Sequence, residues 1–427
     1  MTAAIRLVPA GFLMAASDLV RAFPGLRPLA RRISAELLPR PAPVSASMPA
    51  DNQQLVLAGM FRTANGLGEA ARLNYYALRD AGFSPVCFDL SEAFDQIDHE
   101  TSIPLARSIS PNHCAIIIHT NPPEFIPAIQ ALGIRRWHRT KLIGYWLWEL
   151  SAIPTSWEPA LDLVSEVWAP STFVSEAFLK NPHVQQKKLH ISIVPCPVRV
   201  PSVPETAPEY DKTHPLRVLV MADGRSSLQR KNIFGAIRIF QRSFSQAPQS
   251  ATLTVKTRNL AEFPQSEKQL QHMITGWSNI SLVNKSMSDS EKWQMFRAHD
   301  VLLSAHRAEG FGLHLAEGMA LGKCVMATGW SGNLQFMESG SSVSLPFELV
   351  DVADSDGVYA SEDDSNLKWA AVDEEAAARQ LALLAEDRQS LRAIGKAAPK
   401  AIARNLAPDS LLSETRRLLG LKPTTTG

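Results

Sequence analysis

Two glutamates stand on either side of an expected helix start in the segment RAEGFGLHLAEGMALGKCVMA, residues 307–327. Glu309 lies in the loop before the helix, and Glu317 lies one to two turns into it. A carboxylate in the position of Glu317 can accept two hydrogen bonds from a vicinal diol such as that of a ribose. Glu309 lies nearer the carboxyl end of the preceding strand, where α/β proteins usually bind their ligands. Taken alone, the spacing also fits an ordinary surface glutamate and a carboxylate that complements a helix dipole.

The loop between the two glutamates offers backbone N–H groups to a ligand. The first turn of the expected helix, near Phe311, Gly312 and Leu313, points unpaired N–H groups and the positive end of the helix dipole out of the loop. Gly310 and Gly312 allow a ligand to approach the backbone closely. These groups predict a site for a phosphate or for the hydroxyl groups of a sugar.

Cationic side chains follow the first expected strand of the second half of the chain. The segment MADGRSSLQRKNIFGAI contains Arg225, Arg230 and Lys231 ahead of a helix, and Lys256 ends the neighbouring strand. Arginine and lysine at strand ends suit a diphosphate and stabilise its charge without a metal ion. By itself, the segment could also be a solvated basic loop.

The first half of the chain carries a glycine loop and a histidine at strand ends. In FRTANGLGEAARL, Gly66 and Gly68 precede a helix, but the final glycine of the dinucleotide-binding fingerprint is missing. We interpret this loop as backbone against which a substrate can lie. His119 ends the apolar run CAIIIH and is suited to a role in a cleft, although a hydrogen-bonded structural histidine is the alternative. The aromatic run YWLWELSAIPTSW is more typical of a core than of a sugar platform, and its Glu149 alone suggests a function.

Composition excludes several classes of protein. The 427 residues are 45% hydrophobic and carry a net charge of +1, which is poorly suited to disorder or to general nucleic-acid binding. The four cysteines lack metal-ligand spacing, and we interpret them as reduced core residues of a cytoplasmic protein. Asp354 and Asp356 have the DxD spacing of metal-dependent sugar transferases, but their acidic loop context argues against metal binding. We expect neither a metal site nor a cofactor.

Residues 1–50 form a basic extension with apolar residues at loosely helical spacing. Its apolar run is about half of the ~20 residues that span a bilayer, so it is not a transmembrane helix. Three interpretations stay open: a packed or partly disordered extension, a segment lying on an anionic membrane surface such as the inner membrane, and a signal peptide.

Two α/β units follow the extension. Strands are expected at 55–61, 84–90, 114–119, 141–148, 165–169 and 189–194, and again at 216–222, 251–257, 280–284, 300–305 and 323–328. Helices are expected from Ser171, over 231–246 and 266–276, and from Ser288, whose pairing with Glu291 has the pattern of a capping box. The proline-rich segment 201–215 has the composition of a linker. The pattern predicts doubly wound domains at 51–200 and 216–405 that face each other across a cleft, with a C-terminal helix and tail at 406–427.

The order of these motifs resembles the group-1, family 4 retaining glycosyltransferases of the GT-B fold over roughly residues 55–415. Glu309 and Glu317 match the E-x7-E motif of that family, and Arg225 and Lys231 match its paired diphosphate-binding arginine and lysine. NGLGEAAR is similar to its glycine loop, and His119 falls where many members have a cleft histidine. IGYWLWEL, VWAPSTFV and ATGWSGN resemble a subgroup found in bacterial surface-polysaccharide gene sets. Gly318, where the family usually has alanine, is a departure.

The resemblance implies a metal-independent, retaining transfer of a sugar from a nucleoside-diphosphate-sugar to a glycan or lipid-linked acceptor. Glu317 would bind the ribose, Arg225 and Lys231 the diphosphate, the amides of Phe311 to Leu313 the sugar and phosphate, and Glu309 the transferred sugar. An epimerase or phosphorylase of the same fold is the alternative enzyme. A catalytically silent glycan-binding protein is the alternative from another class.

Overall fold

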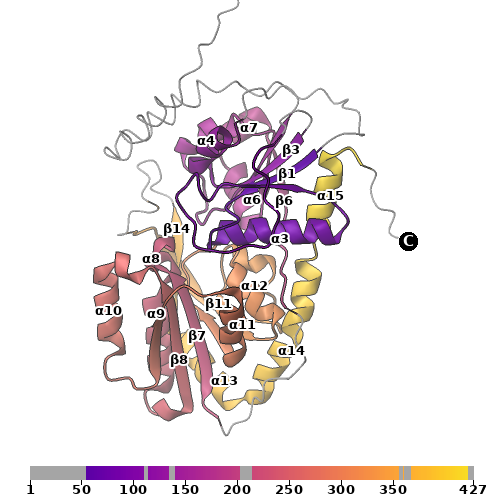
Figure 1. The fold of residues 1–427 in the computed structure, drawn as a ribbon. Helices are drawn as coiled ribbons and strands as arrows, with labels where there is room; N and C mark the ends of the chain where they lie inside the picture. The colour runs from indigo at the N-terminus through magenta and orange to yellow at the C-terminus, as the bar shows by residue number, and fades with distance from the viewer. Residues whose placement is uncertain are drawn as a thin grey trace, which may run out of the picture.

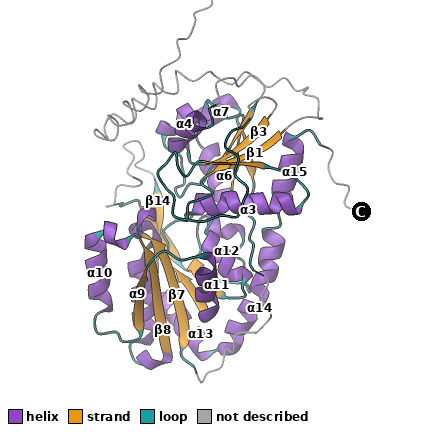
Figure 2. Ribbon diagram, viewed as in Figure 1, coloured by secondary structure: helices purple, strands orange, loops and turns teal. Residues whose placement is uncertain are grey.

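The computed structural model describes residues 54–109, 114–133, 140–201, 214–354, 359 and 367–421. They form two α/β domains, each built on a parallel six-stranded sheet with helices on both faces (Figures 1 and 2). The predicted architecture of two Rossmann-like domains is therefore confirmed. The basic extension 1–50 and most of the expected linker 201–215 lie outside the described residues.

The first sheet has the strand order β2-β1-β3-β4-β5-β6. Its strands are β1 (Gln54–Gly59), β2 (Val86–Asp89), β3 (Cys114–His119), β4 (Lys141–Tyr145), β5 (Glu166–Ala169) and β6 (His190–Ile193). Side chains alternate between the two faces, so Leu55 and Leu57 pack beneath helix α3 (Gly66–Asp80). Val56 and Ala58 pack on the opposite face against α4 (Pro122–Ala131), α5 (Glu158–Leu161), α6 (Thr172–Leu179) and α7 (Pro182–Lys187). Both faces are buried, which explains the continuous apolar runs.

The second sheet has the strand order β12-β11-β10-β7-β8-β9. Its strands are β7 (Leu216–Asp223), β8 (Ala251–Arg258), β9 (Ile280–Asn284), β10 (Val301–Ser304), β11 (Cys324–Thr328) and β12 (Val343–Leu345). Helices α9 (Ile233–Phe244), α10 (Pro264–Ile274) and α13 (Glu374–Glu386) contribute to the core on one face. The other face carries α11 (Asp289–Ala298), α12 (Leu313–Ala320) and α14 (Arg388–Asn405). A small antiparallel pair, β13 (Phe347–Asp351) and β14 (Lys368–Val372), stands apart from both sheets.

Side-chain caps determine where several helices begin. Ser288 and Glu291 form the predicted capping box at the start of α11. Ser171 accepts a hydrogen bond from the Val174 N–H and starts α6 as predicted. Short 3-10 turns complete the connections at Thr155–Trp157, Gly224–Ser226, Pro248–Ser250, Leu260–Glu262 and Gly332–Gln335.

One predicted strand is wrong in extent, and one predicted helix follows a short helix that the sequence pattern does not predict. The strand expected over 141–148 ends at Tyr145, and the Leu147 N–H donates to the Asn121 side chain at 2.9 Å, so the chain leaves the sheet and runs on as a loop. The helix expected over 231–246 is confirmed as α9, which is two residues shorter at each end, and a one-turn helix that was not predicted, α8 (Leu228–Lys231), precedes it. Asn232 separates them with a left-handed backbone, φ 48°, and its amide donates to the Ala305 carbonyl at 2.9 Å.

The C-terminal helices bring the chain back to the first domain. After α14, helix α15 (Asp409–Leu418) lies beside α3, as Figure 1 shows. Leu411 and Leu418 join the core cluster that contains Leu73 of α3, and Arg417 forms a 2.5 Å ion pair with Glu166 at the start of β5. Within the described residues, no helix combines the length and the apolar character that a bilayer crossing requires.

Candidate active site

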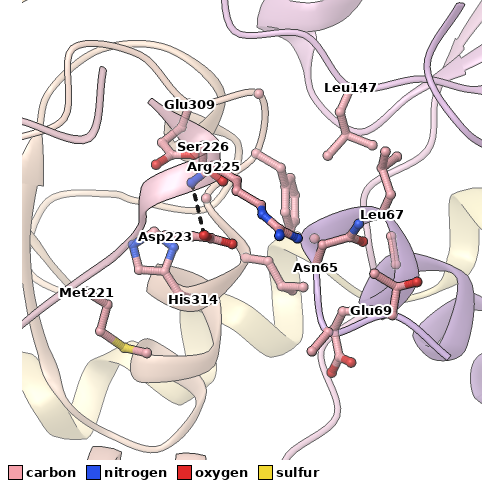
Figure 3. A pocket seen from close by; sticks show the side chains of 18 of the residues that line it. Asn65, Leu67, Glu69, Leu147, Met221, Asp223, Arg225, Ser226, Glu309 and His314 are labelled. Carbon is pink, nitrogen blue, oxygen red and sulfur yellow. Dashed lines mark hydrogen bonds between the residues drawn. The ribbon is translucent and has the colours of Figure 1, made fainter. Parts of the chain in front are cut away.

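A cavity of about 720 Å³ lies between the two domains at the carboxyl ends of both sheets. The first domain lines it with the loops that follow β1, β3 and β4. The second domain lines it with the end of β8, with the loops that follow β7 and β10, and with α11 and α12. The strand order reverses between β1 and β3 and between β7 and β10, and such reversals open crevices for ligands. Figure 3 shows Asn65, Leu67 and Glu69 on one side of this cavity, with Arg225 and Glu309 on the other.

Glu309 is a cavity-lining carboxylate that two cations neutralise. Its side chain is 6% exposed and pairs with the Lys231 ammonium and, at 3.2 Å, with the Arg230 guanidinium. Burial alone would raise the pKa of Glu309, but Lys231 and Arg230 hold it well below its ordinary value. Glu309 is therefore a fixed anion at the end of β10, and it lines the cavity as the sequence predicts.

Arg230 is the one cation of the basic loop to which the family resemblance assigns no role. It is 3% exposed and donates to the Ala308 carbonyl at 2.7 Å and to the Ser226 carbonyl at 3.1 Å. Because α8 is a single turn that ends at Asn232, Arg230 and Lys231 both turn toward Glu309. Asparagine adopts the left-handed conformation more readily than most residues, so Asn232 is the sequence signal that could have predicted the end of α8.

Arg225 lines the cavity as predicted but stands at its exposed edge. Its side chain is 56% exposed and forms a 2.6 Å ion pair with Glu262, and its backbone N–H donates to Asp223 at 3.1 Å (Figure 3). Lys256 also lines the cavity and is 6% exposed. Burial, followed by the nearby Arg258, lowers the pKa of Lys256 to about 8. With Lys231, these side chains supply several positive charges along one wall of the cavity.

Glu317 faces the cavity from α12 and is 4% exposed. Lys292 of α11 donates to it at 2.8 Å and lies 3.5 Å from Glu69 of α3. Burial raises the pKa of Glu317, and the Lys292 ammonium opposes that rise. Lys292 thus joins carboxylates of both domains, a link between positions more than 200 residues apart that no local pattern could predict.

The glycines before α12 have two different roles. Gly312 takes a left-handed conformation, φ 86°, at the N-cap of α12, and it lines the cavity with Phe311 and Leu313 as expected. Gly310 also lines the cavity, but a Cβ there would lie 2.9 Å from the Trp148 carbonyl of the first domain. Its small size therefore lets the two domains touch.

Gly66 and Gly68 also differ from each other. Gly66 lines the cavity and has open space where a Cβ would lie. Gly68 is not among the cavity-lining residues, so the expectation for it is corrected. A Cβ on Gly68 would lie 2.4 Å from the Thr63 carbonyl oxygen and 2.5 Å from that of Met60, which means that this glycine serves packing. Asn65 caps the same helix by accepting from the Gly68 N–H at 2.8 Å.

His119 ends β3 as predicted, but it does not line the cavity. Its fully buried ring stacks on Tyr145 with centroids 4.8 Å apart, and its Nε2 lies 2.8 Å from the Asn74 amide. Burial lowers the pKa of His119 to about 3, so the imidazole is neutral. Tyr145 lines the cavity, and His119 stands behind it. The expected position in the cleft is thus corrected.

Another histidine, for which the sequence predicts no role, does line the cavity. His314 lies in the first turn of α12, and Figure 3 shows it on the same side as Asp223 and Glu309. Burial, followed by Lys231, lowers the pKa of His314 to about 3. His314 lies between Glu309 and Glu317 in the E-x7-E segment, and this position could have indicated a place in the cavity.

The described residues contain no group of three or more histidine, cysteine or acidic side chains that could hold a metal ion. Asp354, from the DxD spacing, accepts from the Tyr359 N–H at 2.8 Å, and Asp356 lies outside the described residues. Cys87, Cys196 and Cys324 are free and buried. In this part of the chain, the residues able to bind an anion are the cationic side chains and the start of α12.

Several solved structures share this fold at low sequence identity. S. aureus TarM, in a complex with Fondaparinux, alpha-GlcNAc-glycerol and UDP, matches at a TM-score of 0.52 and 11% identity over 73% of this chain and 56% of its own. A glycosyltransferase from Rickettsia africae ESF-5 matches at 0.56 and 14% over 86% and 98%. Anabaena HepE, in complex with UDP and glucose, matches at 0.58 and 14% over 86% and 100%. The chain thus spans little more than half the length of TarM.

These similarities establish the fold, which is GT-B as the sequence resemblance implies. No curated protein matches the chain in sequence. A family model described as "Family 4 Glycosyltransferase in conflict systems" matches residues 174–406, which is more than half of the chain. The chain therefore belongs to the family 4 glycosyltransferases, in the group described from conflict systems.

Proposed function

We propose that this glycosyltransferase moves a sugar from a nucleoside-diphosphate-sugar to a glycan or lipid-linked acceptor, with retention of configuration and without a metal ion or other cofactor. The observation that carries the proposal is the position of Glu309 in the cavity between the domains. Lys231 and Arg230 neutralise it, and Glu317 faces the same cavity from α12. The arrangement supplies a fixed anion for a sugar, cations for a diphosphate and a carboxylate for a ribose.

The donor is expected to lie mainly on the second domain. Glu317 accepts hydrogen bonds from the ribose diol, and Arg225, Lys231 and Lys256 surround the diphosphate. The presence of UDP in the TarM and HepE structures supports a uridine nucleotide as the first donor to test. The start of α12 adds backbone N–H groups for the phosphate.

Retention of the anomeric configuration is best explained by a front-face substitution at the anomeric carbon of the sugar. The bond from the anomeric carbon to the diphosphate oxygen breaks, and the acceptor oxygen forms its bond on the same face. The proton of the acceptor hydroxyl passes to an oxygen of the departing diphosphate. Lys231, Lys256 and Arg225 stabilise the charge that develops on this leaving group, the part that a divalent cation plays in other transferases.

We further propose a cytoplasmic enzyme of bacterial glycan biosynthesis that touches the inner membrane through residues 1–40. Liposome co-sedimentation with and without residues 1–45 tests the membrane contact, and equal partitioning of the two chains would contradict it.

The decisive experiment is a panel of UDP-, GDP- and dTDP-sugars assayed for nucleotide release in the presence of EDTA. We expect release with at least one donor, faster with acceptor present, and strongly reduced by Glu309→Ala or Arg225→Ala. A folded sample that releases no nucleotide from any donor would refute the proposal. Conversion of the donor into an epimeric nucleotide-sugar without any acceptor would indicate an epimerase, and dependence on free phosphate a phosphorylase. Cellular function that survives both substitutions would indicate a silent glycan-binding protein.

A further inference from the structure

Glu149 is the one carboxylate of the aromatic run that the proposed donor site leaves unused. It lies in the loop after β4, in the first domain, and lines the cavity together with Trp148 and Tyr359. Its side chain is 20% exposed, against 6% for Glu309. Glu149 is therefore the more accessible of the two carboxylates on this side of the cavity.

The contacts of Glu149 leave much of its hydrogen-bonding capacity open. The Tyr359 hydroxyl donates to Oε2 at 3.2 Å, and Arg230 Nη2 stands 3.9 Å from Oε1, beyond hydrogen-bond distance. An ionised carboxylate accepts about four hydrogen bonds. Among the described residues, Tyr359 is the one side chain that hydrogen-bonds to it. The remaining positions on Glu149 can receive hydroxyl donors from a ligand.

Arg230 connects Glu149 to the reaction centre. This buried guanidinium lies 3.2 Å from Glu309 on one side and 3.9 Å from Glu149 on the other. Glu309 is also paired with Lys231, whereas Glu149 has only the distant ion pair. Two carboxylates from opposite domains thus face one guanidinium, and the carboxylate from the first domain is the less neutralised.

The loop that carries Glu149 is held rigidly by aromatic packing. The Trp148 ring packs edge-on against Trp157 at 4.5 Å and is tilted against Tyr359 at 5.6 Å, and its Nε1 donates to the Ala152 carbonyl at 2.7 Å. The Trp148 backbone lies against Gly310. Aromatic surface with a few fixed polar groups is typical of small-ligand sites.

The charge on Glu149 selects the class of ligand. A carboxylate accepts from hydroxyl groups and repels phosphates, so this position is unsuited to the donor diphosphate. A neutral ring with several hydroxyl groups satisfies both the carboxylate and the aromatic surface. Because Glu149 belongs to the domain opposite the proposed donor-binding residues, the ring that fits it is that of the acceptor.

We propose that Trp148, Glu149 and Tyr359 form a subsite for a neutral acceptor sugar, in which Glu149 accepts hydrogen bonds from ring hydroxyl groups. The inference rests on the proposed glycosyl transfer and adds the chemical class of the acceptor. A hydrogen bond to a charged group contributes about 1.5–3 kcal/mol, which corresponds to a roughly 10- to 150-fold change in acceptor KM.

The test compares Glu149→Gln with Glu176→Gln, which neutralises an exposed glutamate of α6 outside the cavity. The acceptor probes are p-nitrophenyl glucoside, galactoside, mannoside and N-acetylglucosaminide, with the donor that the panel identifies. Transfer, donor hydrolysis by water and calorimetric UDP affinity are measured for each variant. We expect Glu149→Gln to raise acceptor KM at least about tenfold while hydrolysis and UDP affinity stay within about twofold, with Glu176→Gln unchanged. Tyr359→Phe, which removes one hydroxyl group, should raise KM less.

Several outcomes would overturn the inference. Unchanged acceptor KM in both Glu149→Gln and Tyr359→Phe would do so, as would a loss of UDP affinity equal to the loss of transfer, which indicates a structural role. If Glu149→Gln does not fold, Tyr359→Phe decides alone. A wild-type protein that hydrolyses its donor but shows no saturable transfer to any of the glycosides would refute the sugar subsite and leave donor binding standing. A protein that binds and cleaves no nucleotide-sugar would refute the proposed function, and this inference with it.

Discussion

Replacing Glu309 by glutamine tests the central electrostatic feature of the cavity. The substitution keeps the shape of the side chain but leaves Arg230 and Lys231 without their shared anion. Removing one partner of a buried ion pair typically costs about 3–5 kcal/mol. The two cations should respond differently, and this difference determines the size of the effect.

Lys231 can lose its proton, whereas Arg230 cannot. Burial already lowers the pKa of Lys231, and Glu309 is the main group that opposes this shift, so the lysine can become neutral once the glutamate is gone. Arg230 stays charged, although it keeps its bonds to the Ala308 and Ser226 carbonyls. We therefore expect a loss near the lower limit, about 3 kcal/mol. For a domain of this size, that loss lowers Tm by about 6–12 °C.

The assay is thermal unfolding at about pH 7 of the wild type, Glu309→Gln, Arg230→Met and the double variant. Arg230→Met should be costly alone but nearly neutral, or even stabilising, when Glu309 is already glutamine. If the two losses simply add, the charges are independent and the reasoning is refuted. The folded-state pKa of Glu309 is lowered, so its stabilisation is complete above its unfolded value of about 4.3 and disappears as pH falls through the folded value. The difference in Tm between the wild type and Glu309→Gln should therefore persist down to about pH 4.

Three further substitutions test other parts of the site. Gly68→Ala should lower the free energy of unfolding in urea by about 1–3 kcal/mol, because the added Cβ would meet two carbonyl oxygens. Gly66→Ala is the control, since a Cβ there has open space. Equal losses in the two variants would contradict the packing role of Gly68. The pKa of Lys256 is about 8, so UDP affinity measured by calorimetry should weaken as pH rises through that value, and Lys256→Arg should remove the dependence; a pH profile identical to that of the wild type would count against it. Lys292→Met removes the cation that favours the ionised form of Glu317, so UDP affinity should fall more at about pH 6.5 than at about pH 8.5, and an equal loss at both would exclude this explanation.

The ends of the strands could be predicted from the sequence, because the apolar composition of each strand stops where the strand stops. The runs that end at His119, Asp223 and Ser304 are mainly apolar, and parallel sheets bring their carboxyl ends to one edge. Glu309 and Glu317 reach the cavity for this reason. To bring both glutamates of the E-x7-E spacing to the cavity, the chain needed only a strand, a loop and a helix in the expected order.

The direction of individual side chains could not be predicted in the same way. Arg225, Arg230 and Lys231 look equivalent in the sequence, yet Arg225 is exposed, whereas Arg230 is buried and Lys231 is half-buried beside Glu309. Arg225 lies in a 3-10 turn, whereas Arg230 and Lys231 lie in the single-turn helix that ends at the left-handed Asn232, and hydrophobic periodicity does not predict either feature. His119 was placed at the right strand end, but Tyr145 of the neighbouring strand covers its ring.

The position of α15 has a consequence for how the protein is made. A ribosome releases the strands and helices of the first domain long before the last helix that completes its core. Leu411 and Leu418 reach α3 only after the whole second domain has been synthesised, and Arg417 meets Glu166 across 251 residues of chain. A fragment that stops before α15 should leave apolar surface on α3 exposed and aggregate. The N-terminal domain, although it is first in sequence, is expected to mature last.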